Sequence, residues 1–560
     1  MDRRHFMHWL TGAGLTLSHA PKLAFPDDPQ THDVRAASTS IRRALPTPQQ
    51  RAWQELELGL FVHFAPNTWQ DLESDDLSTP LSRINPRQLD TDQWARTAAS
   101  LGARYLVFVA KHQGGFCMWQ TRTTDYSIRG TPWKDGKGDV LAEVAASCKR
   151  HGLGLGVYVC PRDDHFGAAT GGICKTPEMQ ARYDAMYREQ LREVLSGYGD
   201  LVEIWFDGST VTPVADLLSR YQPNAMIFQG PQATIRWVGN EDGFAPYPCW
   251  NGIAANEARS GTATALDGDP DGSEWMPCEV DVSIRRPDWF WSTKNEHRVL
   301  TVDQLLSIYY RSVGRGAQLL LNIPATREGL LPATDSNRAA AFGEELRRRF
   351  ATPLATTSGR GPAVLLTLPG RTRVDTIVLQ EQIEWGERIR AWRVEAQVDG
   401  RWRTVASGSA VGQKCIRPIR PITASELRLV LLDSVEEPRF RKFAAYDTGV
   451  PPPADWSAPS RIWSPNLVGR WSGDRFEVDL SQRVHVAGQY ALLFRAESGK
   501  VEALRDVRFE LSDATDPALI KHSRLKSNEL LLDLTGIDRR MRVTGSIAGS
   551  DAGSILLQRR

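Results

Sequence analysis

Seven short apolar runs recur between residues 59 and 324, and stretches with helical spacing separate them. The runs cover residues 59–64, 104–111, 154–159, 202–208, 225–230, 279–283 and 317–324. The helix candidates cover residues 91–101, 139–150, 177–198, 214–221 and 302–313. The run around Tyr105 to Val109 is apolar on both faces, as strands of a buried parallel sheet are. The alternation predicts a (β/α) barrel of the TIM type with seven or eight repeats over residues 46–350. A doubly wound open sheet is the alternative, but no Gly-rich dinucleotide or phosphate fingerprint supports it.

After Phe350 the pattern changes to short strands without long helices. Strand-like segments cover residues 363–366, 375–379, 391–398, 402–406 and 427–431, which predicts a β-sandwich over residues 355–449. Pro451, Pro452 and Pro453 open a stiff linker that continues to residue 460. Further strand patterns at 476–480, 489–494, 530–534 and 540–544 predict that residues 450–560 comprise this linker and a small β domain of unknown role.

The first twenty residues have the pattern of an export signal. Arg3 and Arg4 precede a short apolar stretch, and Ser18-His19-Ala20 is a small-x-small cleavage site. The arginine pair resembles the twin-arginine type. Residues 21–45 are rich in Pro, Asp, Thr and Ser and are expected to be a linker. No later run reaches the ~20 apolar residues of a membrane span. We therefore expect an exported protein, periplasmic or secreted, without a membrane span.

Composition narrows the classes of partner. Lys and Arg number 68 and Asp and Glu 67, which argues against nucleic acid as the main partner. Seven scattered cysteines without a CxxC pair form neither a disulfide scaffold nor a zinc site, and we expect no metal. The 18 tryptophans suit either sugar-binding platforms or a Trp-rich core, and composition does not decide between them.

Polar residues end several of the apolar runs. His63 ends the first run, His112 and Gln113 follow the second, Tyr158 lies near the end of the third and Asp207 ends the fourth. Barrel enzymes carry their catalytic groups at the carboxyl ends of strands. We therefore expect these side chains to meet at one rim.

Asp207 is the strongest single candidate, because a carboxylate at the end of an apolar strand is costly unless it is paired or functional. Glycosidic chemistry needs a second carboxyl group. The candidates are Glu241, Glu257, Glu274 and Glu279. Glu241 could approach Asp207 to the ~5–5.5 Å separation typical of retaining glycosidases. Spacing alone does not choose it over Glu279.

Several segments of the barrel region match one family. They include Lys111-His112-Gln113-Gly114-Gly115-Phe116, Trp205-Phe206-Asp207-Gly208 and Arg236-Trp237-Val238-Gly239-Asn240-Glu241, with residues 61–68, 156–158, 275–285, 289–291 and 308–324. Through them residues 53–350 closely resemble glycoside hydrolase family 29, the α-L-fucosidases. The resemblance is greatest to the branch that includes plant enzymes acting on α-1,3/1,4-linked fucose. Residues 374–446 resemble the discoidin-like β-sandwich that often follows this barrel.

The resemblance implies a retaining hydrolase of terminal α-L-fucosyl residues that acts on a fucosylated oligosaccharide or glycoconjugate without a metal or cofactor. Asp207 aligns with the nucleophile and Glu241 with the acid/base of this branch. Positions aligned with sugar-binding groups, or lying in the matching segments, are His63, His112, Gln113, Tyr158, Arg236, Trp237, Glu279 and Trp291.

The chain departs from the family pattern at one place. The family usually has Lys-His-His-Asp-Gly-Phe where this chain has Gln113 and Gly114 as third and fourth residues. Gln113 keeps donor and acceptor capacity but cannot carry a proton. Two alternatives follow, a related sugar such as α-L-galactose or a carbohydrate-binding protein without catalysis. The presence of both Asp207 and Glu241 argues against the second.

Overall fold

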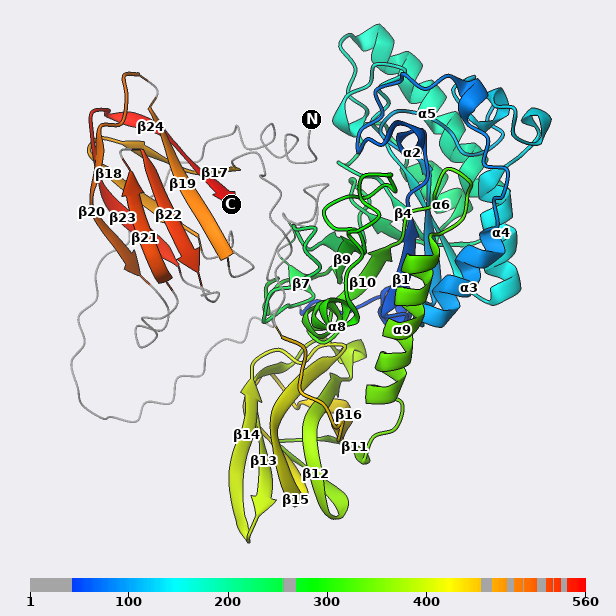
Figure 1. The fold of residues 1–560 in the computed structure, drawn as a ribbon. Helices are drawn as coiled ribbons and strands as arrows, with labels where there is room; N and C mark the ends of the chain where they lie inside the picture. The colour runs from blue at the N-terminus through cyan, green and yellow to red at the C-terminus, as the bar shows by residue number, and fades with distance from the viewer. Residues whose placement is uncertain are drawn as a thin grey trace.

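The computed structural model describes residues 43–253, 255, 268–454, 466–480, 488–496, 498–510, 520–526, 528–534 and 541–559. Three groups of strands follow one another along the chain (Figure 1). The predicted export signal, the predicted linker up to residue 42 and residues 455–460 of the second linker lie outside the described residues and stay predictions. Within the described residues, every helix is too short or too polar to cross a bilayer.

The first group is a barrel of eight parallel strands in the order β5-β4-β3-β2-β1-β10-β9-β6. The strands are β1 (Leu58–Val62), β2 (Tyr105–Lys111), β3 (Gly154–Val159), β4 (Leu201–Trp205), β5 (Met226–Phe228), β6 (Arg236–Trp237), β9 (Cys278–Ser283) and β10 (Gln318–Asn322). A parallel bridge between Phe228 and Ile235 joins the two edge strands. The sheet is therefore nearly closed, which confirms the predicted barrel over the open sheet.

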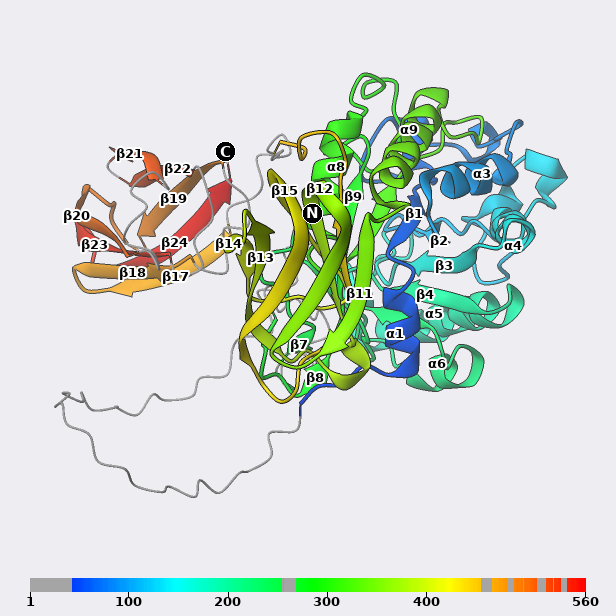
Figure 2. The same cartoon turned by 90° about the horizontal axis from the view of Figure 1, so that it is seen from below.

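Helices precede, separate and follow the strands, and most of them lie on the outside of the sheet (Figure 2). They are α1 (Pro48–Gln54), α2 (Asn67–Gln70), α3 (Thr91–Leu101), α4 (Val140–His151), α5 (Pro177–Gly197), α6 (Ala215–Tyr221), α8 (Val302–Arg311) and α9 (Ala333–Phe350). Local sequence sets their ends. Asp90 caps α3 by accepting from the Gln93 amide, and Gly102 ends it in the left-handed conformation. Asp139 and Gly152 do the same for α4.

The eighth strand escaped the sequence pattern because β6 has only two residues. It also follows β5 directly, since residues 229–235 contain no helix. The barrel thus has eight strands but fewer than eight complete strand–helix repeats. The short connection places the chain after β6 next to the rim formed by its neighbours.

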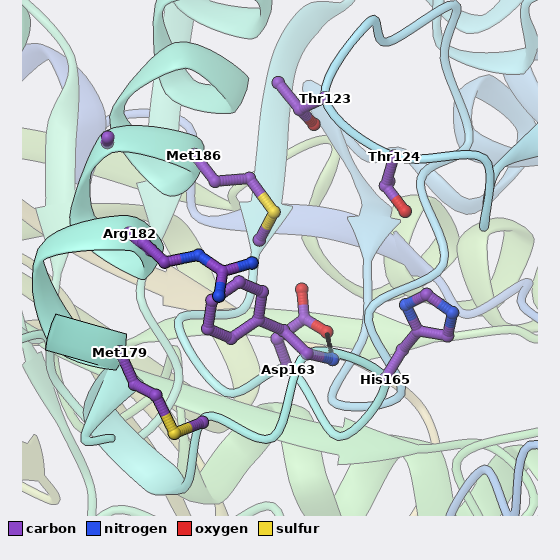
Figure 3. Close-up of a pocket in the computed structure, with 9 residues that line it drawn as sticks. Thr123, Thr124, Asp163, His165, Met179, Arg182 and Met186 are labelled. Carbon is purple, nitrogen blue, oxygen red and sulfur yellow. Dashed lines mark hydrogen bonds between the residues drawn. The ribbon is translucent and has the colours of Figure 1, made fainter. Parts of the chain in front are cut away.

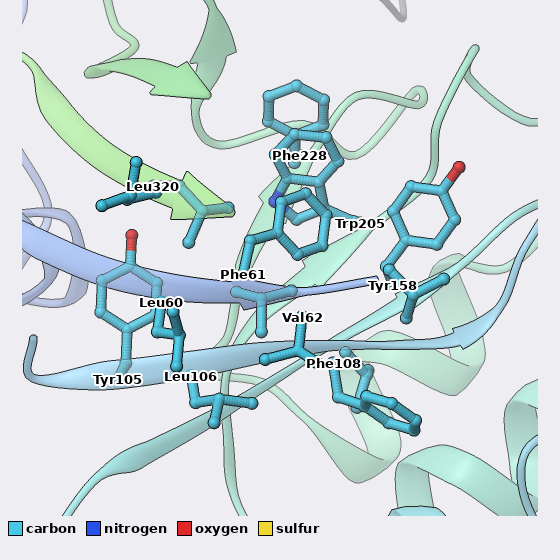
Figure 4. Packing of buried hydrophobic residues seen from close by; sticks show 14 of the residues in the cluster. Leu60, Phe61, Val62, Tyr105, Leu106, Phe108, Tyr158, Trp205, Phe228 and Leu320 are labelled. Carbon is cyan, nitrogen blue, oxygen red and sulfur yellow. The ribbon is translucent and has the colours of Figure 1, made fainter. Parts of the chain in front are cut away.

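Large side chains fill the inside of the barrel (Figure 4). Trp205 stacks on Phe228 with ring centroids 3.5 Å apart, and Phe61 lies 5.0 Å from Trp205. Every residue of β1 and β2 is buried, as the two-sided apolar pattern predicts. The interior is therefore a packed core and not a channel, and the strand ends above it have a solid base.

The second group is an antiparallel sheet in the order β11-β16-β12-β15-β13-β14. Its strands are β11 (Ala355–Arg360), β12 (Ala363–Glu381), β13 (Ile389–Val398), β14 (Arg401–Gly408), β15 (Cys415–Ser434) and β16 (Arg439–Tyr446). The sequence suggested two strands where β12 is continuous. The strand absorbs Pro369 and Gly370 in a register shift between Thr367 and Thr372.

This second unit packs against the barrel through polar and apolar contacts. Lys414 pairs with Glu57, which directly precedes β1, at 2.5 Å. The Glu387 carboxylate accepts from the backbone and side-chain amides of Asn251, both at 2.8 Å. Ile416 belongs to the barrel's own hydrophobic core. Because Glu57 lies at the amino end of β1, these contacts leave the carboxyl ends of the barrel strands uncovered there.

The third group forms two small antiparallel sheets, β17-β24-β19-β22-β21 and β18-β23-β20. Its strands are β17 (Asn466–Ser472), β18 (Arg475–Asp479), β19 (Gly488–Ala496), β20 (Ala503–Glu510), β21 (Ile520–Lys526), β22 (Glu529–Leu534), β23 (Arg542–Ala548) and β24 (Ala552–Arg559). Trp471, Phe476 and Phe494 lie in one shared core. The predicted carboxyl-terminal β domain is present.

Candidate active site

Four neighbouring strands bring the predicted polar residues to one rim. His63 directly follows β1, His112 directly follows β2, Tyr158 lies in β3 and Asp207 follows β4 by two residues. These strands are adjacent and parallel. The structure therefore brings together the side chains that the sequence placed at strand ends.

Asp207 is almost completely buried, with 4% of its surface exposed. Its Oδ2 accepts a hydrogen bond from the Tyr158 hydroxyl at 2.7 Å and a longer one from Gln113 Nε2 at 3.4 Å. The turn that follows has left-handed backbone at Gly208 and Ser209. The Gly208 amide donates to Gln229 Oε1 at 2.7 Å, which fixes this turn and the carboxylate before it.

His63 is held by a defined hydrogen-bond network. Its Nδ1 lies 2.8 Å from Asn322 Oδ1, and Asn322 Nδ2 donates to Ser283 Oγ and to the Trp289 carbonyl. Since the Asn322 amide group serves as donor to those two oxygens, its Oδ1 must be the acceptor for His63. His63 Nδ1 therefore carries a proton, and Nε2 is the nitrogen that would accept a hydrogen bond in the neutral form of the ring.

Glu241 lies on the segment after β6 and is 5% exposed. Trp289 Nε1 donates to its Oε2 at 3.2 Å, and Arg286 Nη1 lies 3.7 Å from the same oxygen. Arg286 also pairs with Asp242 at 2.8 Å. Asp242 shares the cation with Glu241, so Arg286 anchors this segment to the residues after β9.

The ring of His63 lies close to the partners of both carboxylates. Its centroid is 6.2 Å from that of Tyr158, which donates to Asp207. It is 5.2 Å from that of Trp289, which donates to Glu241. Asp207 and Glu241 thus belong to one ring-lined site. His112 lies in the same group and stacks on Tyr158 at 5.7 Å.

Three other predicted site residues, Trp291, Trp237 and Arg236, contact neighbouring protein groups. Trp291 is buried, with the Arg327 guanidinium 5.6 Å from its ring. Trp237 Nε1 donates to Asp281 Oδ1 at 2.5 Å. Arg236 is fully buried and donates to the carbonyls of Met276 and Trp250, which ties β6 to the following loop.

Glu279 lies elsewhere, at the second residue of β9 and inside the barrel. It is fully buried, and the Tyr105 hydroxyl donates to its Oε2 at 3.2 Å. Burial and the charge of Glu203 raise the pKa of Glu279 well above its usual range, and burial raises the pKa of Glu203 to about 7. Of the other candidate glutamates, Glu274 is exposed and Glu257 lies outside the described residues.

The segment that departs from the family pattern packs tightly on its surroundings. A side chain at Gly114 would collide with Asp75, whose carboxylate accepts from Tyr126 and Gln70 at 2.6 and 2.7 Å. A side chain at Gly115 would collide with Asp163. Glycine at both positions is thus a steric requirement, and Asp75 supplies a carboxylate where position 114 has none.

A buried ion pair joins the carboxyl ends of β2 and β3 at this rim. Lys111 Nζ lies 2.8 Å from Asp163 Oδ2, and both side chains are almost fully buried. Asp163 also lines a pocket of about 600 Å³ on the outer side, with His165 and Arg182 (Figure 3). The remaining lining residues are Thr123, Thr124, Phe166, Met179, Ala185 and Met186.

Sequence reasoning missed three residues that contact the candidate carboxylates or their partners. They are Trp289, Arg286 and Arg162, whose Nη1 donates to Gln113 Oε1 at 3.3 Å. Trp289 stands two residues before Trp291 in the same matching segment, so the sequence shows both tryptophans. The structure adds that Trp289 donates to Glu241. Arg162 follows β3 by three residues, a position where a functional side chain is expected. Among the described residues, no three His, Cys, Asp or Glu side chains are placed to share a metal ion.

Comparisons with known proteins find similar sequences and similar solved structures. The family model described as alpha-L-fucosidase matches residues 67–349. The putative alpha-L-fucosidase 1 of Oryza sativa subsp. japonica is 33% identical over 72% of this chain and 85% of its own length. The crystal structure of a putative alpha-L-fucosidase from Bacteroides thetaiotaomicron has a TM-score of 0.69 and 32% identity, and the match covers 72% of this chain and 99% of that one. A Ruminococcus gnavus GH29 fucosidase in complex with fucose has a TM-score of 0.64 and 26% identity, over 72% and 95% of the two chains.

The buried pair of Glu203 and Glu279 should make the barrel less stable as pH rises. A raised pKa means that the folded chain keeps a proton that the unfolded chain has lost, between the usual value of 4.5 and about 7. The free energy of unfolding should then fall by up to about 1.4 kcal/mol per pH unit for each such proton. Glu279→Gln should weaken this slope in urea unfolding at pH 5 to 8. The exposed Glu328→Gln should retain the parent slope. An unchanged slope in Glu279→Gln would contradict this account of the pair.

Proposed function

The chain belongs to the α-L-fucosidase family, and on that premise we propose that it acts by retention, as an exo-enzyme that removes terminal α-L-fucosyl residues. The family assignment makes it a glycoside hydrolase of the α-L-fucosidase type. The observation that supports two-carboxylate catalysis is the pair of buried carboxylates, Asp207 and Glu241, which accept hydrogen bonds from two rings near His63. The retaining outcome is proposed from the family resemblance.

Asp207 is proposed as the nucleophile. Its carboxylate attacks the anomeric carbon, the glycosidic bond breaks, and a covalent fucosyl–enzyme forms. The hydrogen bonds from Tyr158 and Gln113 to Oδ2 hold the carboxylate in one orientation before substrate arrives. Such preorganisation avoids the cost of ordering the group during the reaction.

Glu241 is proposed as the general acid and base. It protonates the departing glycosidic oxygen in the first step and removes a proton from the attacking water in the second. Trp289 donates to Glu241 Oε2 and thereby fixes which way the carboxyl group faces.

His63, His112 and Tyr158 are proposed to bind the sugar in this site. His63 Nε2 suits a hydroxyl donor, given the tautomer set by Asn322. The buried aromatic rings around it suit the C5 methyl group of fucose, whose burial contributes roughly 0.8 kcal/mol.

We expect Asp207→Gly to abolish turnover of an aryl α-L-fucoside, and azide to restore part of it as β-fucosyl azide. A small anion can occupy the space of the missing carboxylate and attack from the same side. The product is identified by NMR. Wild-type rates in Asp207→Gly, or an α-fucosyl azide as product, would remove Asp207 from the proposed role.

Glu241→Ala should slow substrates with basic leaving groups far more than activated aryl fucosides. General acid assistance is worth ~10²–10⁴-fold and matters most when the departing oxygen is basic. Rates on an oligosaccharide and on an activated aryl fucoside give the comparison. The matched control is Glu274→Ala, because Glu274 is exposed on β8 (Glu274–Trp275). Equal losses on both substrates in Glu241→Ala would assign the acid to another residue.

The linkage is proposed to be α-1,3 or α-1,4, from the resemblance to the branch that includes plant enzymes. A panel of α-1,2-, α-1,3-, α-1,4- and α-1,6-linked fucosides, with an aryl α-L-galactoside beside them, separates the possibilities. The α-1,3- and α-1,4-linked substrates should be hydrolysed fastest. A faster rate on the galactoside would favour the related-sugar alternative that Gln113 suggested.

A further inference from the structure

We propose that Arg162 acts as a positioning residue for the nucleophile, through the side chain of Gln113. The proposal rests on the role of Asp207 given above. It assigns to Gln113 a task other than reading a sugar hydroxyl, and it adds to the reaction a cation that the sequence did not single out.

An unbroken chain of polar contacts runs from a surface carboxylate to Asp207. Asp164 binds Arg162 with both oxygens, at 2.7 Å to Nε and 2.9 Å to Nη2. Arg162 Nη1 donates to Gln113 Oε1 at 3.3 Å. Gln113 Nε2 in turn donates to Asp207 Oδ2 at 3.4 Å.

Chemistry fixes the orientation of the Gln113 amide. A guanidinium group only donates, so the Gln113 atom that faces Arg162 must be the oxygen. The amide nitrogen then faces Asp207 Oδ2, which accepts its hydrogen bond. With Gln113 reversed, its nitrogen would face the cation and its oxygen the carboxylate, which is unfavourable on both sides. The contact with Arg162 thus orients Gln113 so that its amide nitrogen donates to Asp207.

The backbone keeps Arg162 and Gln113 in register. The Asp164 amide donates to the Gln113 carbonyl at 2.9 Å, and the His165 amide donates to the Gly114 carbonyl at 3.1 Å. The ion pair between Lys111 and Asp163 lies directly beside these contacts. These contacts hold the segment after β2 to the segment after β3, and the side-chain contacts from Asp164 to Asp207 are built on both segments.

Both polar ends of Gln113 already have protein partners. A sugar hydroxyl at this position would have to use the second N–H or the second lone pair of the amide. The Tyr158 hydroxyl donates to the same Asp207 oxygen at 2.7 Å. Gln113 and Tyr158 both donate to Asp207 Oδ2. We therefore expect Gln113 to influence the reactivity of the Asp207 carboxylate rather than the affinity for substrate.

The test is a double-mutant cycle with Arg162→Met, Gln113→Met and the double variant. An aryl fucoside with a poor leaving group makes formation of the fucosyl–enzyme the measured step. Each single variant should lower kcat about tenfold with little change in KM, the size expected for one long hydrogen bond to a charged group. The double variant should be no slower than the worse single, because both remove the same contact. Arg188→Met is the matched control, since Arg188 makes a similar two-oxygen pair with Asp216 on the surface.

Gln113→Glu gives a second test that does not depend on the Arg162 variant folding. It retains an oxygen for Arg162 but places a carboxylate oxygen, instead of a donor, against Asp207. Its kcat should fall below that of Gln113→Met. Additive losses in the cycle, losses confined to KM, or a Gln113→Glu variant as fast as wild type would each overturn the proposal.

Azide rescue of Asp207→Gly is run in parallel to separate the proposed nucleophile role of Asp207 from the proposed positioning role of Arg162. Absence of rescued β-fucosyl azide counts against the proposed nucleophile itself. Rescue together with additive losses leaves the proposed function intact and overturns the positioning role of Arg162.

Discussion

The buried ion pair between Lys111 and Asp163 holds the rim on which the site is built. Lys111 ends β2 and Asp163 follows β3, so the pair joins the two segments that carry Gln113 and Arg162. Gln190 accepts a further hydrogen bond from Lys111 at 3.1 Å. Burial acts to lower the pKa of Lys111, but the charge of Asp163 raises it above the usual value. Loss of either partner would leave an uncompensated charge in the core, at a cost of about 3–5 kcal/mol.

Neutral donors, and not only cations, surround the proposed catalytic carboxylates. Tyr158 and Gln113 donate to Asp207, and Trp289 donates to Glu241. Cations lie one contact further out, as Arg162 does behind Gln113, or at the 3.7 Å of Arg286 from Glu241. The hydrogen bonds from Tyr158, Gln113 and Trp289 thus orient the carboxylates through neutral groups.

Strand ends and helix bounds could be predicted from the sequence because local chemistry determines them. Asp90 and Gly102 bound α3 at the residues that the pattern predicts, and Asp207 ends an apolar run at the rim. The strand β6 could not be predicted from the sequence, because two residues are too few to show a hydrophobic periodicity. Glu279 was a candidate carboxyl group and lies in a segment that matches the family, yet it is the second residue of its strand and so lies inside the barrel rather than at the rim. Arg162 and Trp289 act through partners distant in sequence, and only the fold shows which side chains they reach.

The close approach of Gly114 and Asp75 makes these two positions interdependent. No side chain fits at position 114 while Asp75 occupies its present place. An acidic residue at position 114 therefore requires a smaller residue at position 75 or a displacement of this segment. Steric exclusion thus limits which single substitutions this rim can accept, whatever sugar the site binds.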